Sequence, residues 1–126
     1  MSLSTPYSEL VERLFRAAPG AGRPEGAGWV SAEAGEPLTA TRVRWHLSVT
    51  AGIVREARYE VRGCPHTVAA LALIAADLKG RAVEGLDVDL TAVSRQLAAP
   101  AATQGRFFVI QDALRKALLQ LQARSA

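Results

Sequence analysis

Residues 42–62, RVRWHLSVTAGIVREARYEVR, contain the pattern that decides the fold. Apolar and polar residues alternate on both sides of the connection Thr50-Ala51-Gly52, so each segment has one apolar and one polar face. A glycine at the end of a short connection suits a tight hairpin loop. The stretch therefore predicts an antiparallel hairpin with one buried face and one wet face. The apolar face consists of Val43, Trp45, Leu47, Val49, Ala57, Tyr59 and Val61.

Charged side chains line the wet face of this hairpin. Its members are Arg42, Arg44, Arg58 and Arg62, interleaved with Glu56 and Glu60, and His46 and Ser48 share the face. Cross-strand ion pairing on a solvated surface explains this pattern, and a docking surface is the alternative. No platform of aromatic residues with interleaved basic residues stands out, so nucleic-acid binding is not expected.

The hairpin is followed directly by Gly63-Cys64-Pro65-His66-Thr67, which contains the single cysteine of the chain. Gly63 permits a sharp turn, and Pro65 suits the first position of a helix. Cys64 is then expected at the N-cap, where unpaired backbone N–H groups and the helix dipole favour the reactive thiolate. The alternative is a small buried cysteine that serves as a hydrophobic residue.

Helical patterns follow Cys64. The segment from Val68 to Leu78 is apolar all round, so it predicts a largely buried helix that stops at Gly80. Residues 82–86 are expected to form one short turn, and Asp89 to cap a helix over 90–97. The last helix is expected from Gly105 to about Arg124.

The part that precedes the hairpin is less regular. Thr5-Pro6 predicts the start of an amphipathic helix that runs to Ala17. Residues 19–28 contain four glycines and two prolines, which indicates a loop that could act as a mobile linker. Trp29 to Ala34 could add a third strand.

Length and composition favour one domain. The chain has 126 residues, 49% of them hydrophobic, with a net charge of +3. We expect a single domain over 1–126, with an N-terminal helix and loop in 1–27 and a core in 28–126. The order of elements predicts an α+β fold in which helices pack on one face of a small antiparallel sheet of two or three strands. One cysteine excludes an internal disulfide, and without a leader or a long apolar run the expected compartment is the cytoplasm.

Three segments within residues 39–122 resemble the NifU/IscU family of iron–sulfur cluster scaffolds. They are the hairpin that ends in Gly63-Cys64, the Leu78–Glu84 connection LKGRAVE, and the Gln111–Leu118 segment QDALRKAL. The resemblance implies an IscU-like sandwich of a sheet and helices. It also implies a role in iron–sulfur cluster assembly beside a cysteine desulfurase or other assembly proteins.

The sequence departs from the family at the cluster ligands. Family scaffolds use three cysteines, an aspartate two residues after the first cysteine, and commonly a histidine before the third. Here the first cysteine and the aspartate fall near Thr39 and Thr41, and the third cysteine falls near Arg106, with Gly105 in the histidine position. Only Cys64 remains, and Arg106 is expected to repel a metal ion and attract an anion.

Cys64 and His66 form an incomplete metal site, because zinc requires about four ligands. An iron–sulfur cluster or zinc would need ligands from a partner or from a second subunit, for example in a homodimer. His66 is otherwise expected to be a solvated residue of the first helical turn, or to raise the thiolate fraction of Cys64 when it is protonated.

Three functions therefore remain open, and none of them makes the chain an enzyme. The first is an accessory or regulatory protein of iron–sulfur cluster assembly. The second is a sulfur relay in which Cys64 accepts a persulfide sulfur, with Arg106 or the helix N-terminus stabilising the anion. The third is a non-catalytic interaction module that keeps the same fold.

Overall fold

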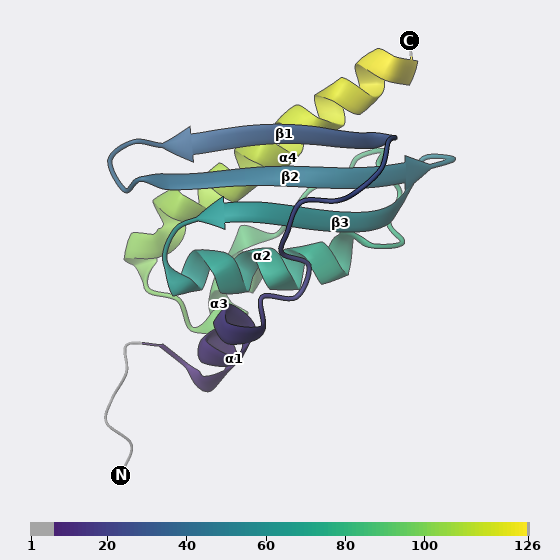
Figure 1. Cartoon of the computed structure of the whole chain (residues 1–126). Coiled ribbons are helices and arrows are strands. Elements are labelled where there is room, and N and C mark those ends of the chain that lie inside the picture. Colours follow the sequence, from purple (N-terminus) through teal and green to yellow (C-terminus); the bar gives the residue numbers. More distant parts are fainter. Residues whose placement is uncertain (1–6, 126) are drawn as a thin grey trace.

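The computed structural model describes residues 7–125, which form a three-stranded sheet and helices in an α+β arrangement (Figure 1). The elements are α1 (Glu9–Ala17), β1 (Trp29–Glu36), β2 (Thr41–Thr50), β3 (Ile53–Arg62), α2 (Pro65–Leu78), α3 (Leu90–Leu97), the short 3-10 helix η1 (Ala101–Thr103) and α4 (Gln104–Ser125). The predicted fold class is confirmed. No helix within residues 7–125 is both long enough and apolar enough to cross a membrane.

The sheet has the order β1-β2-β3, and both neighbouring pairs are antiparallel. The predicted hairpin is confirmed, and its turn places Ala51 and Gly52 at φ values of 53° and 74°, which the twist of a tight hairpin requires. The strand predicted from Trp29 to Ala34 also forms, and it continues to Glu36. In this register Trp45 lies between Ala32 and Tyr59.

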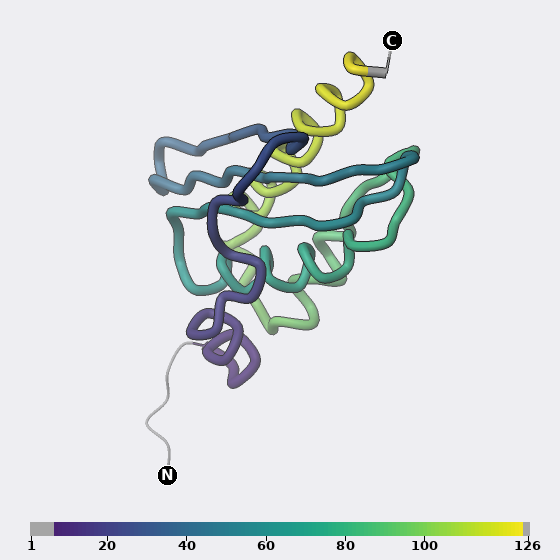
Figure 2. The backbone as a smooth tube through the Cα atoms, turned by 45° about the vertical axis from the view of Figure 1, so that its right-hand side comes forward, coloured from purple at the N-terminus to yellow at the C-terminus, as the bar shows by residue number. Residues whose placement is uncertain are grey.

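The helices α2 and α4 cover one face of the sheet and enclose the core (Figures 1 and 2). Trp45 and Tyr59 are fully buried there, with their ring centroids 6.0 Å apart in an edge-to-face arrangement. The Trp45 indole Nε1 donates a hydrogen bond of 3.1 Å to the carbonyl of Ile110. This bond ties the central strand β2 to α4, the helix that also carries Arg106.

The first helix begins later than predicted. Ser8, and not Thr5, is the N-cap, and its hydroxyl accepts a hydrogen bond of 3.2 Å from the backbone N–H of Val11. Thr5 and Pro6 lie outside the described residues. The Ser8 hydroxyl also donates to the carbonyl of Leu97, at 3.3 Å, which links α1 to the end of α3.

The loop that follows α1 is bonded to the sheet rather than serving as a free linker. The carbonyl of Gly20 accepts from the Tyr59 N–H at 3.1 Å, and the Gly22 N–H donates to the Tyr59 carbonyl at 2.8 Å. The Tyr59 hydroxyl donates to the carbonyl of Pro19 at 3.0 Å. The start of this loop therefore covers the free edge of β3.

We expect Ser8→Ala to lower the free energy of unfolding by about 1 kcal/mol, because it removes the N-cap acceptor of α1. Urea unfolding followed by circular dichroism measures this change. Ser8→Thr keeps the hydroxyl and serves as the control, so its stability should stay close to that of the wild type. Equal stability of the alanine variant and the wild type would show that this cap contributes nothing.

Candidate functional site

Cys64 lies where β3 passes into α2, and the structure confirms the predicted N-cap position. Its backbone is extended, and its carbonyl accepts hydrogen bonds from the N–H groups of Thr67 at 3.0 Å and Val68 at 3.2 Å. Pro65 begins the helix, as its fixed φ and missing N–H favour. The Cys64 residue is partly exposed, so it is not the fully buried cysteine of the alternative interpretation.

Two side chains contact the Cys64 sulfur. The Thr67 hydroxyl lies 3.3 Å from Sγ, and the Arg106 Nη1 donates to Sγ at 3.6 Å from the first turn of α4. Burial raises the pKa of the Cys64 thiol, but hydrogen bonds from Thr67 and the positive charge of Arg106 outweigh it. The net pKa lies below the ordinary value of 9.0. The site therefore favours a partly accessible thiolate.

His66 is buried, and the expectation of a solvated first-turn residue is wrong. Only 5% of the residue is exposed, and its ring lies 4.9 Å from the ring of Tyr7, which precedes α1. Burial lowers the pKa of His66 below 6.5, and the charge of Arg106 lowers it further. Because His66 is neutral near neutral pH, the structure also opposes the idea that protonated His66 activates Cys64.

The lowered pKa of His66 makes stability depend on pH. The unfolded chain takes up a proton as the pH falls through the ordinary value of 6.5, whereas the folded chain does so only at lower pH. We therefore expect the free energy of unfolding to decrease between pH 7 and about pH 5.5. In His66→Phe, which keeps a ring against Tyr7, this decrease should be smaller. Equal pH dependence in urea unfolding of the two proteins would contradict this assignment.

The turn between β1 and β2 contains the other threonines of the predicted site. The Glu36 carboxylate accepts from the backbone N–H groups of Leu38 at 2.9 Å and Thr39 at 2.7 Å, and from the Thr39 hydroxyl at 2.8 Å. The hydroxyls of Thr39 and Thr41 lie 2.8 Å apart. Thr39 is exposed, whereas Thr41 is buried at 2% exposure. This network of hydrogen bonds stabilises the turn.

Arg106 links this turn to Cys64 through its charge. Hydrogen bonds from Leu38 and Thr39 lower the pKa of Glu36, and Arg106 lowers it further at longer range. Within residues 7–125, no hydrogen bond joins Cys64 to Thr39 or Thr41. The structure thus pairs Cys64 with Arg106 and Thr39 with Thr41, while Gly105 is an exposed residue of α4 next to Arg106.

Thr67 and Glu36 were missed by the sequence reasoning. Thr67 had a usable signal, because a hydroxyl three residues after an N-cap can reach back to the cap residue. No sequence signal indicated Glu36. Its carboxylate accepts hydrogen bonds only once the turn has folded, and the charge of Arg106 that lowers its pKa comes from a distant segment.

The donor atoms at this site do not fit a cluster or zinc bound by this chain alone. Such metals are held by several thiolate, imidazole or carboxylate ligands. Within residues 7–125, no group of three or more cysteine, histidine, aspartate or glutamate side chains could hold a metal ion. Instead, Nη1 of the Arg106 guanidinium lies 3.6 Å from Cys64 Sγ. A cation placed there disfavours a second cation and favours an anionic sulfur species.

Comparisons with known proteins identify one family model and several solved structures that this chain resembles. A family model described as the NifU-like N terminal domain matches residues 6–126. No curated protein matches the sequence significantly.

Two solved structures show a similar fold. One, from Fervidobacterium islandicum, is provisionally described as an iron–sulfur cluster assembly scaffold protein for the SUF system. It is 15% identical in sequence, and the match covers 89% of this chain and 96% of the other with a TM-score of 0.72. The second is a nitrogen-fixing NifU-like protein (N-terminal) from Brucella abortus; it is 16% identical, with a TM-score of 0.60 over 87% of this chain and 92% of the other. At sequence identities of 15% and 16%, these similarities establish a shared fold.

Proposed function

This chain belongs to the NifU-like N-terminal domain family, and from that premise we propose that it takes part in iron–sulfur cluster assembly as an accessory protein that accepts sulfur on Cys64. The observation that carries this proposal is the Cys64 Sγ, which lies 3.3 Å from the Thr67 hydroxyl and 3.6 Å from Arg106 Nη1. The fold shared with a protein described as a SUF cluster assembly scaffold supports the pathway.

The proposed step is the transfer of one sulfur atom from a persulfide donor. The Cys64 thiolate attacks the terminal sulfur of a protonated persulfide on a cysteine desulfurase. The S–S bond of the donor breaks, and the donor cysteine leaves as a thiolate. Cys64 then carries the persulfide, whose negative charge after deprotonation is stabilised by Arg106 and the N-terminus of α2. No metal takes part in this step.

The transfer is tested by incubating the protein with a cysteine desulfurase and cysteine, and measuring the intact mass. We expect a species heavier by one sulfur atom, with the added sulfur mapped to Cys64 by peptide analysis. A chain that gains no sulfur while the desulfurase is active would overturn the proposal. That result would favour an interaction module without chemistry.

The accessory role is tested separately by anaerobic reconstitution with iron and sulfide. Because this chain supplies one thiolate and a nearby cation, we expect no stable visible chromophore at one cluster per monomer. A stable cluster at that stoichiometry would contradict the accessory role and support a scaffold. The two experiments are independent, since sulfur acceptance requires no metal.

A further inference from the structure

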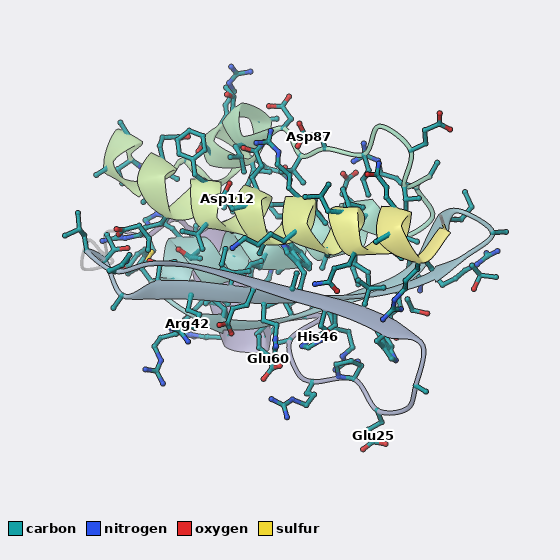
Figure 3. The ribbon with its side chains drawn as sticks, turned by 90° about the horizontal axis from the view of Figure 1, so that it is seen from above. Glu25, Arg42, His46, Glu60, Asp87 and Asp112 are labelled. Atoms are coloured by element: carbon teal, nitrogen blue, oxygen red, sulfur yellow. The ribbon has the colours of Figure 1, made fainter. Side chains whose placement is uncertain are left out.

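A pocket of about 230 Å³ lies on the face of the sheet that points away from α4. Figure 3 shows Arg42, His46 and Glu60 on this face, on the opposite side of the sheet from α4. The pocket is lined by Arg23, Glu33, Arg42, Arg44, Glu60, Val61 and Arg62, and we call it the outer pocket. Four guanidinium groups meet two carboxylates there, which leaves two positive charges in excess.

The two carboxylates are each paired with one rim arginine. Arg42 Nη1 lies 3.3 Å from Glu33 Oε2, and Arg23 Nε lies 3.5 Å from Glu60 Oε1. Both arginine side chains are largely exposed, at 66% for Arg42 and 73% for Arg23. Ion pairs therefore form on this face, but they join Arg42 to Glu33 of β1 and Arg23 of the loop to Glu60, and not the hairpin arginines to Glu56 and Glu60 as expected.

Glu60 is already engaged by a hydrogen-bonded chain across the sheet. The Ser31 hydroxyl lies 2.6 Å from His46 Nδ1, and His46 Nε2 lies 2.8 Å from Glu60 Oε1. His46 lies on the predicted face of the hairpin, but it is only 4% exposed, so the expectation that it is solvated there is wrong. The hydrogen bond from His46 lowers the pKa of Glu60, so this carboxylate stays ionised. Its oxygen Oε1 is occupied by His46 and Arg23.

Arg44 and Arg62 are left without partners. Neither side chain makes a hydrogen bond or an ion pair with any residue from 7 to 125, although Arg44 lies between Glu33 and Glu60 in the strand register. The Arg44 Nε is buried and has no hydrogen-bond partner in the described part of the chain. Arg62 lies directly opposite Arg42, which places like charges side by side. An anion between these groups would supply the missing acceptor and reduce the repulsion.

We propose that the outer pocket binds one small oxyanion of the phosphate class, with Arg44 and Arg62 as its main ligands and Arg42 and Arg23 at the rim. Guanidinium groups bind the oxygens of phosphate in a bidentate manner. A dianion would balance the two excess positive charges. The pocket is also smaller than most sites for drug-sized ligands, which begin at roughly 300 Å³.

The test is a calorimetric titration of the full chain with inorganic phosphate at low salt. We expect saturable binding of one anion per chain, weakened about tenfold or more in Arg44→Gln and in Arg62→Gln, because each loses charge-assisted hydrogen bonds. Arg62 is exposed, so its substitution should leave the fold intact. The matched control is Arg55→Gln, since Arg55 is an exposed arginine of β3 outside the pocket that pairs with no residue from 7 to 125.

Wild-type protein that shows no saturable binding would overturn the proposal, and so would equal weakening in Arg55→Gln and Arg62→Gln. A parallel titration with glycerol phosphate distinguishes the source of the anion. Tighter binding of the ester assigns the site to a phosphorylated metabolite, and equal or weaker binding assigns it to free phosphate. Cys64→Ser should bind phosphate normally, so this test is independent of sulfur transfer.

Discussion

Replacing Cys64 with serine is expected to abolish sulfur acceptance completely. Cys64 is the only cysteine among 126 residues, so no other thiol in the chain can form a persulfide. The hydroxyl of serine has nearly the same size and can keep the contact with Thr67, so the N-cap geometry of α2 should persist. Intact-mass measurement after incubation with a desulfurase and cysteine should show no added sulfur.

The control for Cys64→Ser is Arg55→Gln, which changes a distant exposed side chain and should accept sulfur as the wild type does. Circular dichroism and urea unfolding should show that Cys64→Ser is folded. A sulfur adduct on the serine variant would assign sulfur acceptance to a group other than the thiol. It would thereby remove the observation on which the proposed function depends.

Reversing the charge of Arg106 is expected to have the second largest effect. Arg106→Glu removes a cation 3.6 Å from Cys64 Sγ and places an anion in the same region. Both changes disfavour the thiolate, so the pKa of Cys64 should rise. At neutral pH we expect alkylation by iodoacetamide to slow by about tenfold, since each unit of thiol pKa changes the thiolate fraction about tenfold. Persulfide formation should slow in parallel.

Arg55→Glu is the matched control, because it makes the same change in net charge at the far end of β3. Its alkylation rate should stay within about twofold of the wild type, since exposed charges at that distance are screened by salt. Alkylation of Arg106→Glu at the wild-type rate would show that Arg106 does not stabilise the thiolate.

Much of the fold could be predicted because it depends on local patterns. The alternation around Ala51-Gly52 specifies the hairpin, and Gly63-Cys64-Pro65 specifies the start of α2. The match of residues 6–126 to the NifU-like N terminal domain confirms the family expected from the resemblance. The resemblance also placed Arg106 near the expected ligand site, and in the structure Arg106 donates a hydrogen bond to Cys64 Sγ.

The remaining features depend on contacts between distant segments. Tyr7 packs against the ring of His66 and helps to bury it. The sequence around His66 does not predict this contact, because Tyr7 lies far away along the chain. Ion pairing on the outer face was expected from its interleaved charges, but the observed pairs use Glu33 and Arg23, which lie outside the hairpin. Which arginines remain unpaired depends on Ser31 and His46, which hold Glu60 from neighbouring strands.

The most direct test of a partly exposed and activated thiol at Cys64 is the pH dependence of its alkylation rate in the native protein. Hydrogen bonds from Thr67 and the charge of Arg106 should place the midpoint of this curve below 9.0, with rapid reaction before any unfolding. A midpoint at or above 9.0, or a thiol that reacts only after denaturation, would contradict the account.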